Sequence, residues 1–254
     1  MALPPRQFAE LVLHLARREL AATHEGTFIG WAWPIVRQLA QLGVLVFVFG
    51  SVLDLGIENF AVFVFTGLIA WTWFSTGLSA ATSSLIANRH LVFQPRLPAI
   101  VLPIVAIAVP FVDVLFALPI VIGMLIVTGE MSWQIVTWPA IMLLQFGLMA
   151  GIAWITASLS VYARDIPGLV SVVLTMLFYL TPVFYGLRSV PDEYEWVLNL
   201  NPLTTLISAY RAVMIGEPGP SMSLVVAVML ASIVVAYSGW RLFRRLERGL
   251  ADHL

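Results

Sequence analysis

Residues 60–84 read FAVFVFTGLIAWTWFSTGLSAATSS, and they decide the fold because no charged side chain interrupts them. A helix that crosses the hydrocarbon core of a membrane needs about 20 consecutive, mainly apolar residues. This stretch meets that requirement, and so do five other runs: residues 34–53, 99–127, 135–160, 166–187 and 222–241. We therefore predict an all-α integral membrane protein with about six transmembrane helices.

The composition supports this prediction. Hydrophobic residues make up 60% of the 254 residues and charged residues only 11%, whereas a soluble domain is about 45–50% apolar and about 25% charged. No soluble domain or internal repeat is evident, so residues 1–254 are predicted to form a single membrane domain. The absence of cysteine excludes disulfides, thiolate nucleophiles and cysteine metal sites.

The first 25 residues have a different pattern from the spans. Their apolar residues recur at helical spacing, and polar residues fall on the opposite face. The apolar face holds Phe8, Leu11, Val12 and Leu15, and the polar face holds Gln7, Glu10, His14, Arg17 and Arg18. No continuous apolar run typical of a cleavable signal is present. We predict an amphipathic helix in the membrane interface over about residues 5–25, with a disordered charged tail as the alternative.

Arginines set the predicted orientation, because cytoplasmic loops are enriched in positive charge. All 13 basic residues are arginine. Most belong to one set of connections, which holds Arg6, Arg17, Arg18, Arg89, Arg96, Arg164, Arg241, Arg244, Arg245 and Arg248. The alternate connections hold only Arg188 and Arg211, together with several acidic residues. Both termini and residues 87–97 are therefore predicted to be cytoplasmic, and residues 188–220 to lie on the outer side.

The sequence lacks the motifs of an enzyme. A Walker A loop holds ATP phosphates with a lysine, and the chain has no lysine. Residues 24–28, HEGTF, begin like a zinc-protease motif, but Phe28 stands where the second histidine is needed. No Gly-x-Ser-x-Gly elbow is present. We therefore predict no catalytic residue, no metal ligand, no cofactor held by this chain and no nucleic-acid partner.

Two charged residues, Asp113 and Arg37, stand inside predicted spans rather than at their last residue. Asp113 lies deep in the third span, where a carboxylate is either part of a proton relay or a residue that packs between helices or contacts water. Its lack of an obvious partner favours packing. Arg37, together with Gln38 and Gln41, makes the first span unusually polar. Its side chain faces either a subunit interface or cavity, or the cytoplasmic surface.

Residues 188–220 predict two short helices on the outer side. Pro191 and Asp192 suit the start of the first helix, and Asn201 followed by Pro202 suits the start of the second. Gly216 can end the second helix. Both helices are too short to span a membrane, so they either re-enter it against protein or form a surface hairpin.

Four segments, in order along the chain, resemble ABC-2-type polysaccharide export permeases. Residues 26–34, GTFIGWAWP, are similar to the family's Gly-Ser/Thr-x-Leu-Gly-x-x-Trp element, which links the interface helix to the first span. Three further segments resemble later elements of the family: RDI at residues 164–166, LNPLTTLISAYRAVM at 200–214 and GWRLFRRLERGLADHL at 239–254. The family often has a basic triplet before the first element. Thr23, His24 and Glu25 stand there instead, so no phosphate-binding role is carried over to them.

The resemblance implies the transmembrane subunit of an ATP-driven exporter. Two copies would form a channel, and two separate ATPase subunits would bind Mg-ATP. The exported molecule would be a glycan on a polyprenyl pyrophosphate carrier in the bacterial inner membrane, as for O-antigen, teichoic acid, capsule or galactan. Residues 87–97 would carry the helix that docks on the ATPase, through Asn88, Arg89, His90, Leu91 and Phe93. Without such a partner, these residues are only a topology signal.

The expected export path has three further groups of candidate residues. Arg17, Arg18, Gly26, Thr27, Gly30 and Trp33 are expected at the membrane entry, where the arginines can attract anionic lipid headgroups. The channel candidates are Arg37, Gln41, Trp71, Trp73, Phe74 and Asp113, although any ring among them is alternatively part of the interfacial aromatic belt. The candidates for an outer gate are Tyr185, Asn201, Pro202, Tyr210 and Arg211.

Two other functions remain open from the sequence. An ABC-2 exporter of a small lipid or drug would share the topology and the ATPase partner. A proton-coupled secondary transporter would have more intramembrane carboxylates and an inverted repeat, and neither is evident.

Overall fold

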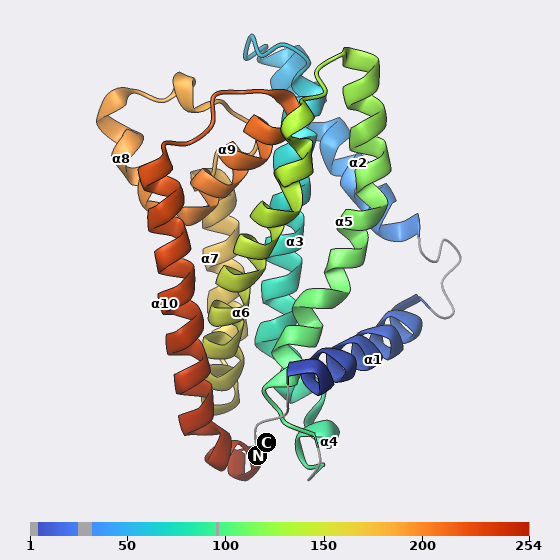
Figure 1. Ribbon diagram of the computed structural model, residues 1–254, viewed down its shortest axis with the longest axis vertical. Helices are drawn as coiled ribbons and strands as arrows, with labels where there is room; N and C mark the ends of the chain where they lie inside the picture. The colour runs from blue at the N-terminus through green and yellow to red at the C-terminus, as the bar shows by residue number, and fades with distance from the viewer. Residues whose placement is uncertain (1–4, 25–31, 95–96, 254) are drawn as a thin grey trace.

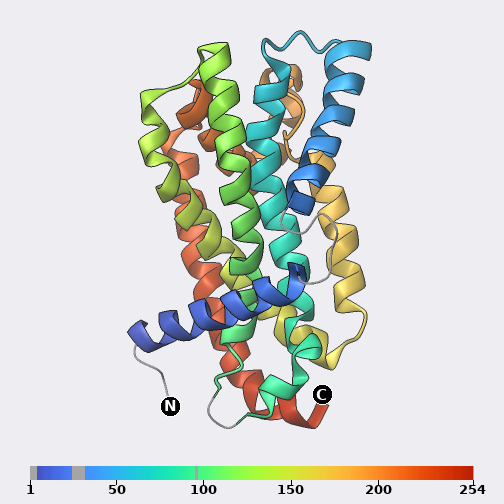
Figure 2. The same ribbon diagram turned by 90° about the vertical axis from the view of Figure 1, so that its right-hand side faces the viewer.

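The computed structural model describes residues 5–24, 32–94 and 97–253, which form a helical bundle with no strand among them (Figures 1 and 2). The first half contains α1 (Pro5–His24), α2 (Trp33–Leu45) with its π-helical continuation η2 (Val46–Val52), α3 (Phe60–Ala87), α4 (Arg89–Val92) and α5 (Val101–Thr128). The second half contains η3 (Trp133–Thr137), α6 (Trp138–Tyr162), α7 (Ile166–Leu180), η4 (Leu187–Ser189), α8 (Asp192–Leu200), α9 (Pro202–Ile215), α10 (Met222–Leu246), η5 (Glu247–Gly249) and α11 (Leu250–His253).

Five helical stretches in the described part of the chain are long and apolar enough to cross a membrane. They are Trp33–Val52, Phe60–Ala87, Val101–Thr128, Trp133–Tyr162 and Met222–Leu246. The sequence predicted about six, the extra one over residues 166–187. There α7 has only 15 residues, or about 22 Å at 1.5 Å per residue. It ends because Pro182 follows Thr181, and a residue before proline is forced into the extended conformation that Thr181 adopts.

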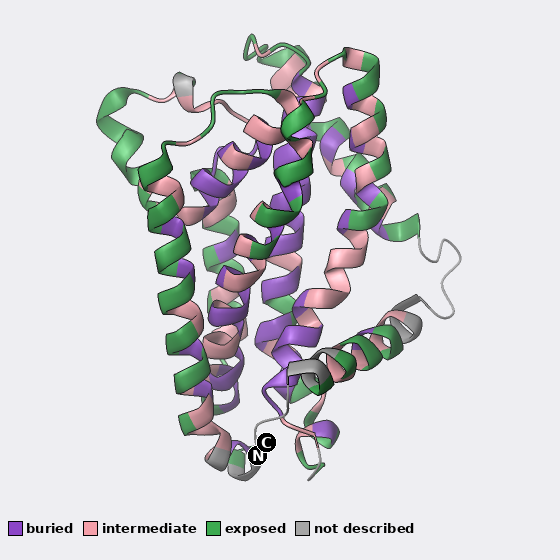
Figure 3. Cartoon of the chain, viewed as in Figure 1, coloured by how far each residue is buried: buried purple, intermediate pink, exposed green. Residues whose placement is uncertain are grey.

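The stretch that decides the fold, now α3, is the central helix of the bundle. All residues from Val62 to Phe74 are buried, as the purple helix in the middle of Figure 3 shows. It packs between α5 and α6, and it also contacts α7 and α9. A helix that is hydrophobic all round is stable only when other helices cover it, which accounts for its position.

Helices α6 and α10 approach each other backbone to backbone. A methyl group added at Gly151 would lie 2.5 Å from the Ala236 nitrogen, and one added at Gly239 would overlap the Gly151 carbonyl oxygen. Small residues at a helix contact allow this close approach inside membranes. Among the glycines of the described residues, Gly151 and Gly239 lie closest to a neighbouring helix, so α6 and α10 are the most tightly packed pair at a glycine contact.

The two ends of the bundle differ. At one end lie α1, α4 and α11, and at the other end lie α8 and α9 (Figure 1). The first end has its own hydrophobic cluster, which includes Ala16 from α1, Leu91 from α4, Ile100 just before α5, Phe243 from α10 and Leu250 from α11. Helix α1 contacts α5 and slants across the long helices of the bundle (Figure 2). This cluster ties the short helices of that end to the long ones.

Candidate functional site

A groove with polar and aromatic walls runs between α2, α3 and α7. Its volume is about 500 Å³, and it is lined by Gln41, Trp71, Ser75, Thr76, Ser79, Ser171, Leu174, Thr175, Phe178 and Tyr179. Polar side chains in a membrane-spanning segment are costly to expose to lipid, so they face protein or water. The groove is thus the strongest candidate in the described part of the chain for a surface that contacts a polar molecule.

Aromatic rings extend from the groove toward the α8–α9 end. The Trp71 and Phe178 ring centroids are 5.5 Å apart, and Phe178 lies 5.7 Å from Phe184 in the turn after α7. Phe184 stacks on Phe49 of η2 at 4.7 Å. These distances lie within the range of favourable aromatic pairs. The rings therefore form a continuous series that joins three elements.

Hydroxyl groups make the rest of the groove wall polar. The Ser75 and Thr76 hydroxyls donate to the Thr72 carbonyl at 3.3 Å and 2.6 Å, and Thr175 donates to Ser171 at 2.9 Å. Because each hydroxyl donates to its own helix, its oxygen still has lone pairs that can accept a hydrogen bond from a ligand. Flat aromatic faces beside hydroxyl and amide groups suit a carbohydrate or another polyol.

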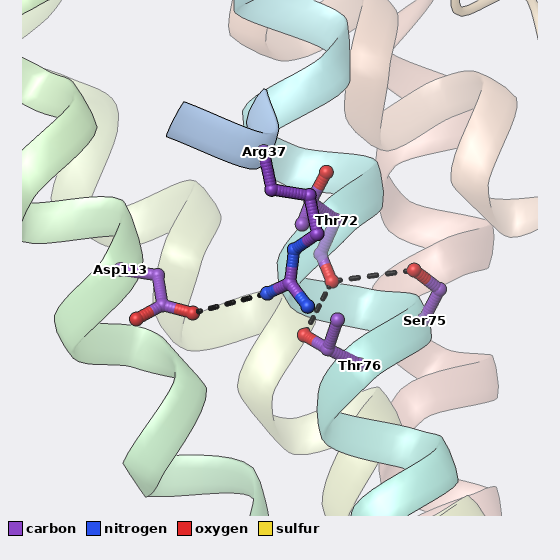
Figure 4. A network of polar contacts seen from close by, with 5 residues as sticks. All are labelled: Arg37, Thr72, Ser75, Thr76 and Asp113. Atoms are coloured by element: carbon purple, nitrogen blue, oxygen red, sulfur yellow. Dashed lines mark hydrogen bonds and ion pairs between the residues drawn. The ribbon is translucent and has the colours of Figure 1, made fainter. Parts of the chain in front are cut away.

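Arg37 and Asp113 meet beside this groove. Arg37 Nη2 lies 4.0 Å from Asp113 Oδ2, with side-chain exposures of 52% and 17%. Figure 4 shows the guanidinium of α2 between Asp113 of α5 and the Thr72–Thr76 turn of α3. The sequence singled out both residues but did not pair them. Asp113 therefore has a charged partner, contrary to the expectation from the sequence.

Of the three aromatic channel candidates, two lie at the groove and one does not. Trp71 lines the groove, and the buried Phe74 packs near it, with ring centroids 6.0 Å apart. Trp73 points elsewhere: its indole N–H donates to the Ile107 carbonyl at 3.1 Å, and its ring packs 5.1 Å from Phe111. It is thus part of the α3–α5 packing rather than of the groove.

The outer-gate candidates lie together at the α8–α9 end. Asn201 caps α9 by accepting from the Leu203 N–H at 3.0 Å, and it donates to Thr181 at 2.8 Å, while Pro202 is the first residue of α9. The Tyr185 hydroxyl donates to the Tyr179 carbonyl at 3.2 Å, and partial burial raises the pKa of Tyr185 above its usual value.

Tyr210 and Arg211, the other two candidates, are buried in the core. Tyr210 donates to Gln145 Oε1 at 2.9 Å. Arg211 Nη2 donates to the Val183 carbonyl at 2.7 Å, and the guanidinium carbon lies 3.4 Å from the centre of the Phe63 ring. These contacts attach α9 to α3, to α6 and to the turn after α7.

The docking candidates of residues 87–97 differ in how far their side chains are buried. Leu91 is only 4% exposed because it belongs to the hydrophobic cluster of its own chain, whereas Phe93 is 54% exposed. Arg89 and His90 are exposed, and the Asn88 amide donates to the Ser84 carbonyl at 3.2 Å. The loop thus offers a surface of Arg89, His90 and Phe93, with Leu91 turned inward.

The membrane-entry candidates are only partly described. Arg17 and Arg18 are exposed on α1, and Trp33 at the start of α2 is 55% exposed. Gly26, Thr27 and Gly30 lie outside the described residues. Among the residues that are described, no cluster of three or more histidine or acidic side chains could hold a metal ion.

Sequence reasoning missed the α7 wall of the groove. Ser171, Thr175 and Tyr179 recur every four residues, which places them on one helix face. That spacing was the available signal. It was hidden because the segment as a whole is apolar enough to be interpreted as an ordinary lipid-facing span.

Comparisons with known proteins agree with this architecture. The profile of the family described as ABC-2 type transporter matches residues 10–215. An O-antigen export system permease protein RfbA from Myxococcus xanthus is 30% identical over 251 residues, covering 98% of this chain and 96% of the relative. An RfbA from Klebsiella pneumoniae is 24% identical, covering 96% and 95%. A polysialic acid transport protein KpsM from Escherichia coli is 24% identical, covering 90% of each chain.

Proposed function

The chain belongs to the ABC-2 type transporter family, and from this premise we propose that it is the transmembrane subunit of an ATP-driven polysaccharide exporter. It would move a glycan attached to a lipid carrier from the cytoplasmic to the outer side of a bacterial inner membrane. The observation that carries the proposal is the groove of α2, α3 and α7, in which aromatic rings and hydroxyl groups stand together within membrane-spanning helices.

A second copy of the chain would complete the path. Arg37 and Ser79 are exposed and Gln41 is half-buried beside the groove, and polar groups within membrane-spanning helices are stable against protein or water rather than lipid. Two grooves that face each other would enclose a path in which sugars contact rings and hydroxyls. The hydroxyls would accept hydrogen bonds from whichever sugar is passing, because serine and threonine rotors adapt to the ligand.

ATP binding and hydrolysis would take place in separate partner subunits. Phe93 offers an exposed apolar anchor, and Arg89 and His90 offer charge beside it. Interface hot spots commonly combine an aromatic anchor with charged neighbours that fix its orientation. In this arrangement α1 lies in the cytoplasmic membrane interface with both termini on that side, and α8 and α9 re-enter the membrane from outside as a gate.

Mass spectrometry of polyprenyl-linked lipids in the native host, after depletion of this protein, tests the proposal. We expect a carrier-linked polymer to accumulate on the cytoplasmic side, and its sugars would identify the substrate. Retention of a different lipid or small molecule, with no carrier-linked polymer, would replace the proposal with an exporter of that molecule.

A further inference from the structure

Arg37 and Asp113 meet far from both ends of the bundle. Asp113 is 12 residues after Val101 and 15 residues before Thr128, which places it about 18 Å and about 22 Å from the two ends of α5 at 1.5 Å per residue. On α3, the neighbouring Thr72–Thr76 turn is equally central. The ion pair with Asp113 holds Arg37 at this central level of α5, which favours the inward-facing position of Arg37 over its extension to the cytoplasmic surface.

The Arg37 guanidinium has unused hydrogen-bonding capacity. Its contact with Asp113 is 4.0 Å, whereas charge-assisted N–H···O bonds are about 2.7–2.9 Å long. Over the described residues, Arg37 makes this ion pair and no hydrogen bond. Five N–H donors, on a side chain that is 52% exposed, are thus available to an acceptor that the described residues do not supply.

The neighbouring glutamines of α2 add a second, independent observation. Gln41 is one turn further along the same helix face and lines the groove. Gln38 is only 2% exposed, yet neither its amide nitrogen nor its amide oxygen has a partner within the described part of the chain. Buried amides are normally satisfied, so α2 carries polar groups that have no partner among the residues the structure describes.

We propose that Arg37 binds an oxyanion, a phosphate or a carboxylate, of the molecule that occupies the groove, and that Asp113 is the internal counter-ion of Arg37 when the groove is empty. The planar guanidinium fork matches such oxyanions. An anion that crosses a low-dielectric region is strongly disfavoured unless a positive charge compensates it, and Arg37 supplies that charge midway. This inference rests on the proposed export function and specifies which chemical group of the cargo the groove recognises.

The two members of the pair should affect anion binding in opposite directions. With full-length protein in phosphatidylcholine nanodiscs, we would measure by calorimetry the binding of farnesyl diphosphate, with farnesol as the uncharged control. Arg37→Gln should weaken diphosphate binding by about tenfold or more, because a charge-assisted contact is lost. Asp113→Asn should strengthen it several-fold, because the competing carboxylate is gone. Arg37→Lys should retain part of the affinity, and Arg241→Gln, on an exposed arginine of α10, should change nothing.

A second pair of probes identifies the source of the oxyanion. A glucuronate-containing tetrasaccharide and the neutral maltotetraose would be compared on the same variants. Arg37-dependent binding of farnesyl diphosphate assigns the site to the carrier phosphate, and Arg37-dependent binding of the acidic tetrasaccharide assigns it to an acidic sugar.

A purely structural ion pair would give a different result. Arg37→Gln and Asp113→Asn would then both lower the unfolding temperature and shift affinity in the same direction or not at all, and the inference would be wrong. Binding of maltotetraose that is equal in all variants, without binding of either anion, would also overturn it while leaving the export function intact. Absence of carrier-linked polymer in depleted cells is the separate result that would overturn the function.

Discussion

Tyr210 of α9 and Gln145 of α6 are joined by a 2.9 Å hydrogen bond between the tyrosine hydroxyl and the amide oxygen. Gln145 in turn donates its amide N–H to the Ala70 carbonyl of α3 at 2.9 Å. All of these polar atoms are buried. This chain of bonds connects the short helix α9 to the two helices at the centre of the bundle, so α9 is an integral part of the core.

Tyr210→Phe should destabilise the protein by about 1–3 kcal/mol, since the Gln145 oxygen would be left buried without a donor. The measurement is the thermal unfolding of the purified protein in detergent. Tyr194→Phe is the matched control, because Tyr194 on α8 is 56% exposed and its hydroxyl can bond to water. Equal unfolding temperatures for the two variants would show that the Tyr210–Gln145 bond contributes no stability.

Gly239→Ala should strongly destabilise the α6–α10 pair. The new methyl would overlap the Gly151 carbonyl oxygen, and such overpacking typically costs about 1–3 kcal/mol or more when backbone must move. Gly147→Ala, on α6 itself, is the control, because nothing lies within 4 Å of an added Cβ there. The yield of monodisperse protein and its unfolding temperature report the difference. A Gly239→Ala variant as stable as Gly147→Ala would contradict the close contact.

Phe93→Ala should affect association with the ATPase, whereas Leu91→Ala should affect the stability of the permease. Loss of the exposed Phe93 ring should reduce co-purification of the ATPase subunit while leaving the unfolding temperature of this chain almost unchanged. Loss of the buried Leu91 side chain should instead lower stability, because large-to-small core substitutions cost about 2–5 kcal/mol. The two readouts are pull-down of the ATPase and thermal unfolding of the permease. If Phe93→Ala retained full association, the docking assignment would fail.

Tyr179→Ala should reduce the rate of glycan export. Its ring is 64% exposed and lines the groove, so its removal takes away a surface for sugars at little cost to packing. Tyr194→Ala changes a ring that is 56% exposed and does not line the groove, and it should leave export unaffected. Surface glycan would be quantified in a depletion strain complemented with each variant. Matching export by both variants would remove Tyr179 from the path.

Much of the fold could be predicted from local sequence patterns. The absence of charge over residues 60–84 identified a span, and it became the central helix α3. Asn201 and Gly216 flank α9 where their capping preferences placed the helix ends. The length of α7 was overestimated, since hydrophobicity continues past Pro182 although the helix does not.

The site required three-dimensional information. Arg37 and Asp113 were each recognised as unusual, but a helical period gives the face of a residue and not its partner on another helix. Leu91 and Phe93 are both apolar residues of one short loop, and only the position of α4 shows which of them is inside. Trp71 and Trp73 are two positions apart on α3, hence on different faces, and the neighbours of each face are set by the packing of the whole bundle.

The glycine contact between α6 and α10 also has a mechanical consequence. Because their backbones touch, α10 cannot slide or roll against α6 before the two helices separate, so they respond to force as one rod. Helix α2 has the opposite character: most of its side chains point away from the rest of the chain. Helix α2 can therefore shift against α3 and α5 while α6 and α10 stay together, and such a shift would widen or narrow the groove.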